Sequence, residues 1–555
     1  DPMREANPTA TTSIGDYLIQ RLRDYGIADV FGIPGDYVLS FYGMLEQSEL
    51  NVVGCTREDS AGFAADAYAR LHGMGALCVT YCVGGLSVCN SIAGAFAEKS
   101  PVVVISGAPG RNERRNNPLL HHKVRDFHTQ RQVFEKLCID VAELNDPNTA
   151  FSEIDRVLDA AQRFKRPVYI ELPRDMVHVV PTNSRKFQRI EAEVDQAGLA
   201  EAVRETVARL AAAQKPVIIA GVEIHRFGLQ DLVLRLAESL QIPITATILG
   251  KSVVRETHPL YLGLYEGAMG RENVTHFVEE SDCVLLLGTF MTDINLGIYT
   301  ANLELRKCIY STSEQLQVSH HYYHHVPLDA FLNELLAQQP TTTVREIPAN
   351  LRRTLDEDFV VEPQRELSVS RMVKLINRRL RKDNIVIADI GDALFASTEL
   401  LVHERADFLS PAYYTSMGFA TPATLGACVA KPDQRVITLC GDGAFQMTGT
   451  ELSTIIRQGF APILIILDNH GYGTERFLHA GNWKYNEIHP WSYHQLPLIY
   501  GDGRGYLVET EGEFAEALAQ AWEDTSCAQI IQAKISDGDA SQTLLRLAER
   551  MGRQV

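Results

Sequence analysis

The first candidate for chemistry is a Gly-Asp-Gly turn at residues 441–443, which directly follows a short apolar run at 436–440. Its two glycines allow a sharp turn and let a ligand approach backbone N–H groups closely. Asp442 supplies a hard oxygen that suits Mg²⁺. An amphipathic helix expected to begin near Thr450 would favour a phosphate at its N-terminus. The turn therefore predicts a site for a phosphorylated ligand and a metal ion.

A second apolar run, 463–467, ends in the sequence Asp-Asn-His-Gly-Tyr at 468–472. The side chain of Asn469 and the backbone carbonyl of Gly471 could complete the protein ligands of the metal, with diphosphate oxygens and water filling an octahedron. Ligands of open α/β sheets lie at the carboxyl ends of the strands, where both runs would end. The 24 residues between the two motifs can form the intervening helix and strand.

Ionisable side chains elsewhere could move protons. Glu58 follows a β-branched run at 51–54 and opens an alanine-rich segment, 58–70, that is typical of a tightly packed helix. An acid there would ordinarily complement the helix dipole. His121 and His122 carry imidazoles that titrate near neutrality. Because adjacent side chains cannot face the same way on regular structure, we expect at least one of these rings to point into a cleft.

The elements that must position these residues follow a regular rhythm. Short apolar, β-branched runs alternate with longer amphipathic stretches along the whole chain. That alternation predicts an α/β fold in which parallel sheets are covered by helices. The 555 residues fit about three domains of roughly 150 residues each. Polar, proline-containing stretches near 181–190 and 340–363 indicate the boundaries.

Composition excludes several classes of partner. The formal net charge of −18 argues against nucleic acid and against an anionic membrane surface. Apolar runs of about 18 residues are absent, and the first residues lack the pattern of a secretory signal, so we expect a cytoplasmic protein. The ten cysteines are scattered without a Cys-x-x-Cys motif, which argues against a zinc knuckle or a disulfide framework.

These motifs resemble those of the thiamine-diphosphate enzymes, in which Gly-Asp-Gly is followed, after a similar spacing, by Asn-Asn or a close variant. Asp468 stands where the first of those asparagines often stands, and Asn469 takes the place of the metal-binding one. The resemblance covers nearly the whole chain. It implies three doubly wound parallel-sheet domains: a pyrimidine-binding domain at 10–183, a Rossmann-like, non-catalytic middle domain at 196–340 and a diphosphate- and Mg²⁺-binding domain at 364–555.

The resemblance also implies how thiamine diphosphate is held. Glu58 would hydrogen-bond the N1′ nitrogen of its aminopyrimidine ring, the Thr415 carbonyl would accept a hydrogen bond from N4′, and Met417 would support the bent cofactor from below. In the family the glutamate and the diphosphate site come from different subunits, so we expect a homodimer or a homotetramer. The implied cofactor contacts are Glu58, Thr415, Met417, Gly441, Asp442, Gly443, Ala444, Asn469, Gly471 and Tyr472, and the implied metal ligands are Asp442, Asn469 and Gly471.

A narrower resemblance points to decarboxylation. Pyruvate and indolepyruvate decarboxylases carry a His-His pair at the place of His121 and His122. Asp36 matches the acid of a Gly-x-Pro-Gly-Asp turn that works with those histidines, and Glu475 matches the acid that follows the metal loop. With Glu58, these four residues would catalyse non-oxidative decarboxylation of a 2-oxo acid to an aldehyde and CO₂, through a cofactor ylid and an enamine.

The family's positions around the substrate's side chain indicate which acids would be accepted. Thr474 stands where pyruvate-specific relatives have a branched aliphatic residue, so we expect aromatic or branched-chain 2-oxo acids to fit. Asp392 departs from the threonine that many decarboxylases place near the diphosphate, and we expect it to cap a helix at 393–401. The positions that map to the substrate pocket are Thr292, Leu394, Phe395, Thr474, Leu478 and Trp491.

Two other functions remain open. A carboligase similar to acetohydroxyacid synthase would share the same cofactor site, and its middle domain often binds FAD. The segment 221–224 offers no Gly-x-Gly-x-x-Gly turn, which argues against a dinucleotide there. A non-catalytic relative would not be expected to keep Glu58, Glu475 and both histidines. The histidine-rich run at 320–325 resembles a metal site in composition, but we expect surface or strand-edge histidines there.

Overall fold

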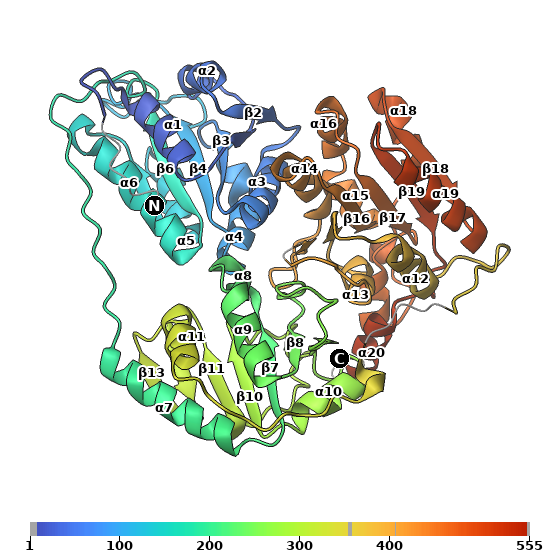
Figure 1. Ribbon diagram of the computed structural model, residues 1–555. Helices are drawn as coiled ribbons and strands as arrows, with labels where there is room; N and C mark the ends of the chain where they lie inside the picture. The colour runs from blue at the N-terminus through green and yellow to red at the C-terminus, as the bar shows by residue number, and fades with distance from the viewer. Residues whose placement is uncertain (1–7, 353–357, 406, 552–555) are drawn as a thin grey trace. The chain divides into compact units, whose positions relative to one another are not determined.

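The computed structural model (Figure 1) describes residues 8–352, 358–405 and 407–551. These residues form two compact units. The first unit runs to residue 191 and also takes in 421–432 and 448–460, while the second contains the rest. One sheet lies in the first unit and two lie in the second. Three sheets covered by helices were predicted and are confirmed. The division into domains at 10–183, 196–340 and 364–555 stays a prediction.

The first unit is built on a six-stranded parallel sheet with the order β2-β1-β3-β4-β6-β5. Every residue of β3, β4 and β6 is buried, because helices cover both faces of such a sheet. The strands are β1 (Asp29–Gly32), β2 (Asn51–Gly54), β3 (Gly75–Val79), β4 (Val102–Ala108), β5 (Asp140–Glu143) and β6 (Val168–Pro173). The helices are α1 (Ile14–Asp24), α2 (Leu39–Gln47), α3 (Glu58–His72), α4 (Cys89–Ala97), α5 (Thr129–Leu137) and α6 (Pro147–Phe164).

The first sheet of the second unit has seven strands in the order β13-β12-β11-β10-β7-β8-β9. Parallel pairing was expected throughout, but β12 pairs antiparallel with both of its neighbours, β11 and β13. Only residues 312–314 join β11 to β12, too few for a crossover helix, so a hairpin must form. The strands are β7 (Pro216–Ala220), β8 (Ile244–Ala246), β9 (Tyr261–Leu264), β10 (Cys283–Leu287), β11 (Cys308–Ser311), β12 (Gln315–Val318) and β13 (His321–His324), and the helices are α7 (Gln196–Ala212), α8 (Val222–Arg226), α9 (Gln230–Leu240), α10 (Glu272–Glu279) and α11 (Leu328–Ala337).

The histidine-rich run lies at the edge of this sheet. β13 is the outermost strand, and its residues are exposed except for Tyr323. His321 Nδ1 lies 3.0 Å from Glu205 Oε2, so this histidine pairs with a carboxylate of α7. The expectation of strand-edge histidines is therefore confirmed.

The second sheet of this unit has the order β15-β14-β16-β17-β19-β18, and all of its strands are parallel. From β14 the chain goes to β15 on one side and then returns to β16 on the other, so the strand order reverses between β14 and β16. Ligands of open α/β sheets bind at such a point, outside the carboxyl ends of the strands. The strands are β14 (Asn384–Ala388), β15 (Phe408–Leu409), β16 (Arg435–Gly441), β17 (Ile463–Asp468), β18 (Arg504–Val508) and β19 (Gln529–Lys534).

Nine α-helices of this part of the chain are described. They are α12 (Val369–Arg379), α13 (Asp392–Ser397), α14 (Ala420–Ala430), α15 (Asp442–Thr448), α16 (Glu451–Arg457), α17 (Gly473–Leu478), α18 (Leu496–Tyr500), α19 (Glu511–Glu523) and α20 (Gln542–Met551). None of the helices in the described part of the chain is both long and apolar enough to cross a membrane.

A buried ion pair joins the two sheets of the second unit. The Lys251 ammonium group donates to Glu256 and to the Leu400 carbonyl, and both charged side chains are almost wholly buried. Glu256 also accepts hydrogen bonds from the Tyr261 hydroxyl at 2.7 Å and from the Val402 amide at 2.9 Å. Residues 400–402 follow α13, whose N-terminal end lies at the reversal point of the last sheet.

We predict that Lys251→Met lowers stability strongly, because it leaves the Glu256 carboxylate buried without its cation. Removing one partner of a buried pair costs about 3–5 kcal/mol. The matched control is Arg306→Met, whose partner is Glu304 on the surface. Exposed pairs contribute about 0–1 kcal/mol. Thermal unfolding of both variants would measure the difference, and equal melting temperatures would contradict the prediction.

Candidate functional site

Three oxygen atoms converge where β16 and β17 end. The parallel register pairs Gly441 with Leu467, so the turns that follow the two strands lie side by side. The amide oxygen of Asn469 lies 3.2 Å from Asp442 Oδ1 and 2.8 Å from the Gly471 carbonyl oxygen. With the amide oxygen inward, three oxygens face one another and a cation between them would stabilise the arrangement; with the amide reversed, its nitrogen donates to the other two oxygens instead. Their hard oxygen chemistry suits Mg²⁺, so the residues fit the predicted metal site.

The backbone around Gly471 explains why its carbonyl can point at Asp442. A Cβ atom at this position would lie 1.9 Å from the Asn486 carbonyl oxygen, so only glycine can approach so closely. The preceding residue, His470, has a φ of 60°, and this left-handed turn reverses the chain after β17. The Gly471 amide in turn donates to Asp442 Oδ2 at 3.2 Å. The turn is therefore held to the carboxylate on which the metal site depends.

The electrostatics of Asp442 favour a positive ion. Its side chain is almost completely buried. Burial, together with the neighbouring Asp468 carboxylate, raises the pKa of Asp442 to about 7. A bound cation would offset both effects and stabilise the ionised form.

A phosphate would meet the start of a helix at this turn. The sequence predicted a helix from near Thr450, and α16 does begin at Glu451. However, an additional helix, α15, already begins at Asp442, so the Gly-Asp-Gly turn itself forms a helix N-terminus. No atom lies within 4 Å of a Cβ built on Gly441, which leaves its backbone accessible. A Cβ on Gly443 would instead strike the Tyr472 ring at 2.6 Å.

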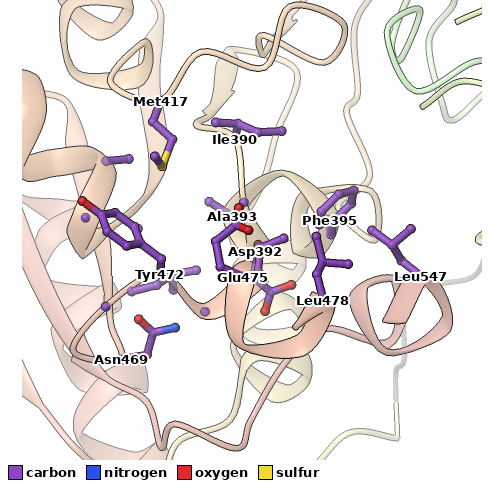
Figure 2. A pocket seen from close by; sticks show the side chains of 18 of the residues that line it. Ile390, Asp392, Ala393, Phe395, Met417, Asn469, Tyr472, Glu475, Leu478 and Leu547 are labelled. Carbon is purple, nitrogen blue, oxygen red and sulfur yellow. The ribbon is translucent and has the colours of Figure 1, made fainter. Parts of the chain in front are cut away.

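A cavity of about 380 Å³ extends from the converging oxygens within the second unit. Figure 2 shows Asn469 and Tyr472 on one side, Phe395, Leu478 and Leu547 on the other, and Glu475 between them. The cavity thus has a polar end and an apolar end, with a carboxyl group in the middle. The predicted cofactor contacts that line it are Thr415, Met417, Gly441, Asp442, Gly443, Ala444, Asn469, Gly471 and Tyr472.

The predicted substrate residues divide into two groups. Phe395, Thr474 and Leu478 line the cavity. Leu394 is fully buried, and Trp491 is 40% exposed and packs against Tyr493. The Thr292 hydroxyl accepts a hydrogen bond from the Asn295 amide, and its neighbours Asp293 and Ile294 line the cavity instead. Apolar lining residues that the sequence reasoning missed are Ile298, Val369, Ile390, Ile535 and Leu547.

Asp392 does not cap its own helix, so that expectation is wrong. Gly391, with a φ of 105°, is the residue that precedes α13, and Asp392 is the first residue inside the helix, which ends at Ser397. Its carboxylate accepts hydrogen bonds from the Ser541 amide, at 2.9 Å, and from the Ser541 hydroxyl. Burial raises the pKa of Asp392 to about 6.

The contact with Asp392 fixes the start of α20. The Ser541 hydroxyl accepts a hydrogen bond from the Leu544 amide at 3.1 Å, as a helix cap does. α20 then brings Leu547 to the apolar end of the cavity (Figure 2). Apolar residues recur on one face of this last segment, which predicts a packed helix, but no motif placed that helix at the site.

A second missed residue, Asp389, orders the loop that carries Thr415 and Met417. Its buried carboxylate accepts hydrogen bonds from the Gly418 amide at 3.2 Å and from the Ala420 amide at 2.9 Å. Burial raises the pKa of Asp389 to about 6. Thr415 itself has a φ of 59°, so the loop turns sharply just before Met417. An acid at the end of a buried strand is the signal that could have identified Asp389.

In the first unit, both histidines of the predicted pair face one carboxylate. His121 Nε2 lies 2.5 Å from Asp36 Oδ2, and His122 Nε2 lies 3.9 Å from Asp36 Oδ1. Regular structure would turn adjacent rings apart, but His122 has a φ of 68° and lies in a turn, so both rings point the same way. The Tyr37 ring stacks on His121, and its hydroxyl donates to the His121 carbonyl at 3.1 Å. This arrangement can hold and transfer a proton.

The same three side chains could also ligate a metal, since one atom from each lies within 4.8 Å of the others. However, the Arg174 guanidinium lies 3.8 Å from Asp36 Oδ2. A fixed cation so close to the carboxylate opposes a second one. We therefore interpret Asp36, His121 and His122 as a proton-transfer group.

Glu58 is the first residue of α3, as predicted. Its side chain is partly buried, and among the described residues no hydrogen bond or ion pair involves its carboxylate. Glu451, which the sequence reasoning missed, fixes the approach to this helix by accepting hydrogen bonds from the Thr56 amide at 2.8 Å and the Arg57 amide at 3.2 Å. The start of α3 is thus held in place, and the Glu58 carboxylate remains available to an outside donor.

Comparisons with known proteins agree with this geometry. Three family models match: the N-terminal TPP binding domain of thiamine pyrophosphate enzymes at residues 12–136, their central domain at 203–338 and their C-terminal TPP binding domain at 378–531. Indole-3-pyruvate decarboxylase of Azospirillum brasilense is 36% identical, over 97% of this chain and 98% of that protein. Pyruvate decarboxylase 1 of Pisum sativum is 33% identical over 99% and 94%, and an alpha-keto-acid decarboxylase of Mycobacterium avium is 32% identical over 94% and 93%.

We predict that Asp442→Asn weakens Mg²⁺ binding in the presence of thiamine pyrophosphate, because it removes the one formal charge among the three converging oxygens. Loss of even an outer-shell partner typically costs about 10–100-fold in metal affinity, so at least a tenfold loss is expected. Calorimetric titration with Mg²⁺ would measure it. The matched control is Asp433→Asn, because Asp433 is an exposed residue two positions before β16. This variant should bind Mg²⁺ with normal affinity. An unchanged affinity in Asp442→Asn would contradict the assignment.

Proposed function

The chain belongs to the thiamine-diphosphate-dependent 2-oxo acid decarboxylase family, and from this premise we propose that it converts a bulky 2-oxo acid, aromatic or branched-chain, to an aldehyde and CO₂ without oxidation. The observation that carries the proposal is the two-ended cavity. Oxygen atoms suited to a cation lie at one end, apolar side chains at the other, and the Glu475 carboxyl group lies between them.

Thiamine diphosphate, when bound with Mg²⁺, supplies a carbon nucleophile for the 2-oxo carbonyl and accepts the electrons that remain when CO₂ leaves. The polar end of the cavity supports its placement there, with Asp442, Asn469 and the Gly471 carbonyl holding the metal ion. The N-terminus of α15 would bind the diphosphate oxygens. Thr415 and Met417 would contact the rest of the cofactor.

Glu58 would hold a proton at the N1′ nitrogen of the aminopyrimidine ring. Its position at the start of α3 and the lack of a partner among the described residues support this role. Because the predicted metal ligands lie in the other unit of the fold, the proposal includes self-association, in which Glu58 of one subunit serves the metal site of another. A homodimer is the smallest such assembly, and a homotetramer can be built from two dimers.

Asp36, His121 and His122 would return a proton to the carbon atom that loses CO₂. The 2.5 Å contact between His121 Nε2 and Asp36 supports this role, because the carboxylate fixes the orientation of a ring that can carry a proton. Glu475 lies in the cavity itself, and we assign it to the substrate's carboxyl group. Acetohydroxyacid synthase-like carboligation would use the same cofactor but would not need a proton at this carbon.

The preference for a bulky acid is supported by the apolar end of the cavity. Phe395, Leu478 and Leu547 come from three separate helices and line the cavity together with Thr474. A difference of one methylene group in such a pocket changes discrimination by about 1–3 kcal/mol. The ordering of substrates is therefore set by a few side chains.

The direct test is to supply the protein with thiamine diphosphate and Mg²⁺ and offer pyruvate, a branched-chain 2-oxo acid, phenylpyruvate and indolepyruvate in turn. We expect CO₂ and free aldehyde in equal amounts, with higher kcat/KM for the larger acids. CO₂ accompanied by a hydroxy-keto product instead of aldehyde would establish the carboligase alternative. Absence of CO₂ from every acid would exclude the proposed decarboxylation. A higher kcat/KM for pyruvate would exclude the proposed preference for bulky acids.

We predict that Glu58→Gln lowers kcat by about 10²–10⁴-fold, the usual contribution of a proton-handling group. Binding of the diphosphate and Mg²⁺ should change little, because the metal ligands lie elsewhere. Asp59→Asn is the matched control, since Asp59 is the next residue of α3 and, within the described part of the chain, pairs with local donors, the Arg57 guanidinium and the Ser60 amide. Steady-state kinetics would compare the two, and full activity in Glu58→Gln would contradict the assigned role.

A further inference from the structure

A buried charge cluster lies at the beginning of the loop that carries the two histidines. Arg114 Nη1 donates to Glu143 Oε1 at 2.6 Å, and Arg114 Nη2 lies 3.7 Å from Glu171 Oε2. The side chains of Arg114, Glu143 and Glu171 are 13%, 12% and 0% exposed, so water screens their charges little. Glu143 belongs to β5 and Glu171 to β6, which pair in parallel and place both carboxyl groups in one row.

The protonation of the two acids leaves a single negative charge opposite Arg114. Burial and the Glu143 carboxylate raise the pKa of Glu171 to about 8. Burial acts the same way on Glu143, but hydrogen bonds with Asn145 and Arg114 outweigh it and lower the pKa of Glu143. At neutral pH one carboxyl group is therefore protonated and the other ionised. The Tyr169 hydroxyl also donates to Glu171 Oε1 at 2.7 Å, which fixes the position of this carboxyl group.

Arg114 connects this cluster to the histidine loop. Residues 109–128 contain no helix or strand, so the loop has no regular hydrogen bonding of its own. Arg114 Nε donates to the Pro109 carbonyl at 2.9 Å, at the point where the loop leaves β4. The Arg114 guanidinium also lies over the buried Phe127 ring, 5.9 Å from its centre.

The far end of the loop is held against the same ring. Lys123 follows His122 directly, and its ammonium group lies 4.4 Å from the centre of Phe127. Lys123 also donates to Asn117 Oδ1 at 2.7 Å and to the Pro118 carbonyl at 3.0 Å. Arg114 and Lys123 thus both contact Phe127, one on each side in sequence of His121 and His122, which face Asp36. Of the two, only Arg114 is tied to the sheet beneath.

We propose that Arg114 is a positioning residue for proton transfer: held by the buried carboxyl pair Glu143 and Glu171, it fixes the loop so that His121 and His122 face Asp36. The inference rests on the proposed function, because it assigns importance to the geometry of the proton-transfer group. A displacement of about 1 Å in such a group can cost about 10²-fold in rate. Arg114 itself touches neither the cavity nor the three proton-transfer side chains, so it acts through the loop.

The structure offers a matched control in Arg131. Its Nε atom lies 3.4 Å from Glu143 Oε2, so it pairs with the same carboxylate, but it belongs to α5 and does not hold the loop. Arg114→Met and Arg131→Met each remove one cation from Glu143 and leave the other in place. Arg114→Lys keeps a charge at the loop and should restore part of the lost function.

The experiment compares hydrogen–deuterium exchange of peptides covering 109–128 with kinetics of 2-oxo acid decarboxylation in the full-length protein with thiamine diphosphate and Mg²⁺. We expect Arg114→Met to increase exchange in these peptides and to lower kcat about tenfold or more with little change in KM. Arg131→Met should change neither, and Arg114→Lys should lie between wild type and Arg114→Met. Equal losses of kcat in Arg114→Met and Arg131→Met, or unchanged exchange in Arg114→Met, would overturn the proposal.

The two readouts separate this inference from the proposed function. If the protein decarboxylates none of the acids tested, exchange in residues 109–128 still reports whether Arg114 fixes the loop. Increased exchange without any decarboxylation would then refute the proposed function and retain the anchoring. Unchanged exchange with a normal wild-type activity would refute the anchoring alone.

Discussion

The convergence of the Asp442 carboxylate, the Asn469 amide oxygen and the Gly471 carbonyl is the interaction on which the rest of the site depends. The inward Asn469 atom lies 3.2 Å from Asp442 Oδ1 and 2.8 Å from the Gly471 carbonyl oxygen, so either a cation lies between three oxygens or the amide is reversed and its nitrogen donates to both. The fold holds these groups together through the register of β16 and β17 and through the close approach of Gly471 to Asn486. The fold thus holds oxygen donors of the kind that Mg²⁺ prefers close together, and the cavity extends from this point.

The segments around this site are positioned in a similar way at several places. Buried carboxyl groups accept hydrogen bonds from the backbone or side chains of distant segments: Asp389 holds residues 418–420, Asp392 holds the start of α20, and Glu451 holds residues 56–57. The hydrogen bonds offset part of the cost of burying these acids, and each acid fixes its partners because leaving them unpaired is costly. These three acids do not take part in the proposed chemistry, yet each positions a segment that does.

How far the sequence predicted the site depends on whether the signal was local. The strand-turn motifs at 441–443 and 468–472 and the helix start at Glu58 follow from residues close together in the chain, and the structure places them at strand and helix ends as expected. The contact of Asp392 with Ser541 joins residues 149 positions apart, and helix capping was the only local explanation available. Both histidines face Asp36 because His122 adopts a positive φ, and a histidine in the sequence does not predict such a backbone conformation.

The most direct test of this account is anomalous X-ray diffraction from crystals of the protein grown with thiamine diphosphate and Mn²⁺ in place of Mg²⁺. The account predicts a strong manganese peak about 2.1 Å from Asp442 Oδ1, Asn469 Oδ1 and the Gly471 carbonyl oxygen, the distance usual for a small octahedral cation. The remaining positions should be filled by diphosphate oxygens and water. A peak at Asp36, His121 and His122 instead, or no peak near Asp442, would contradict the central claim.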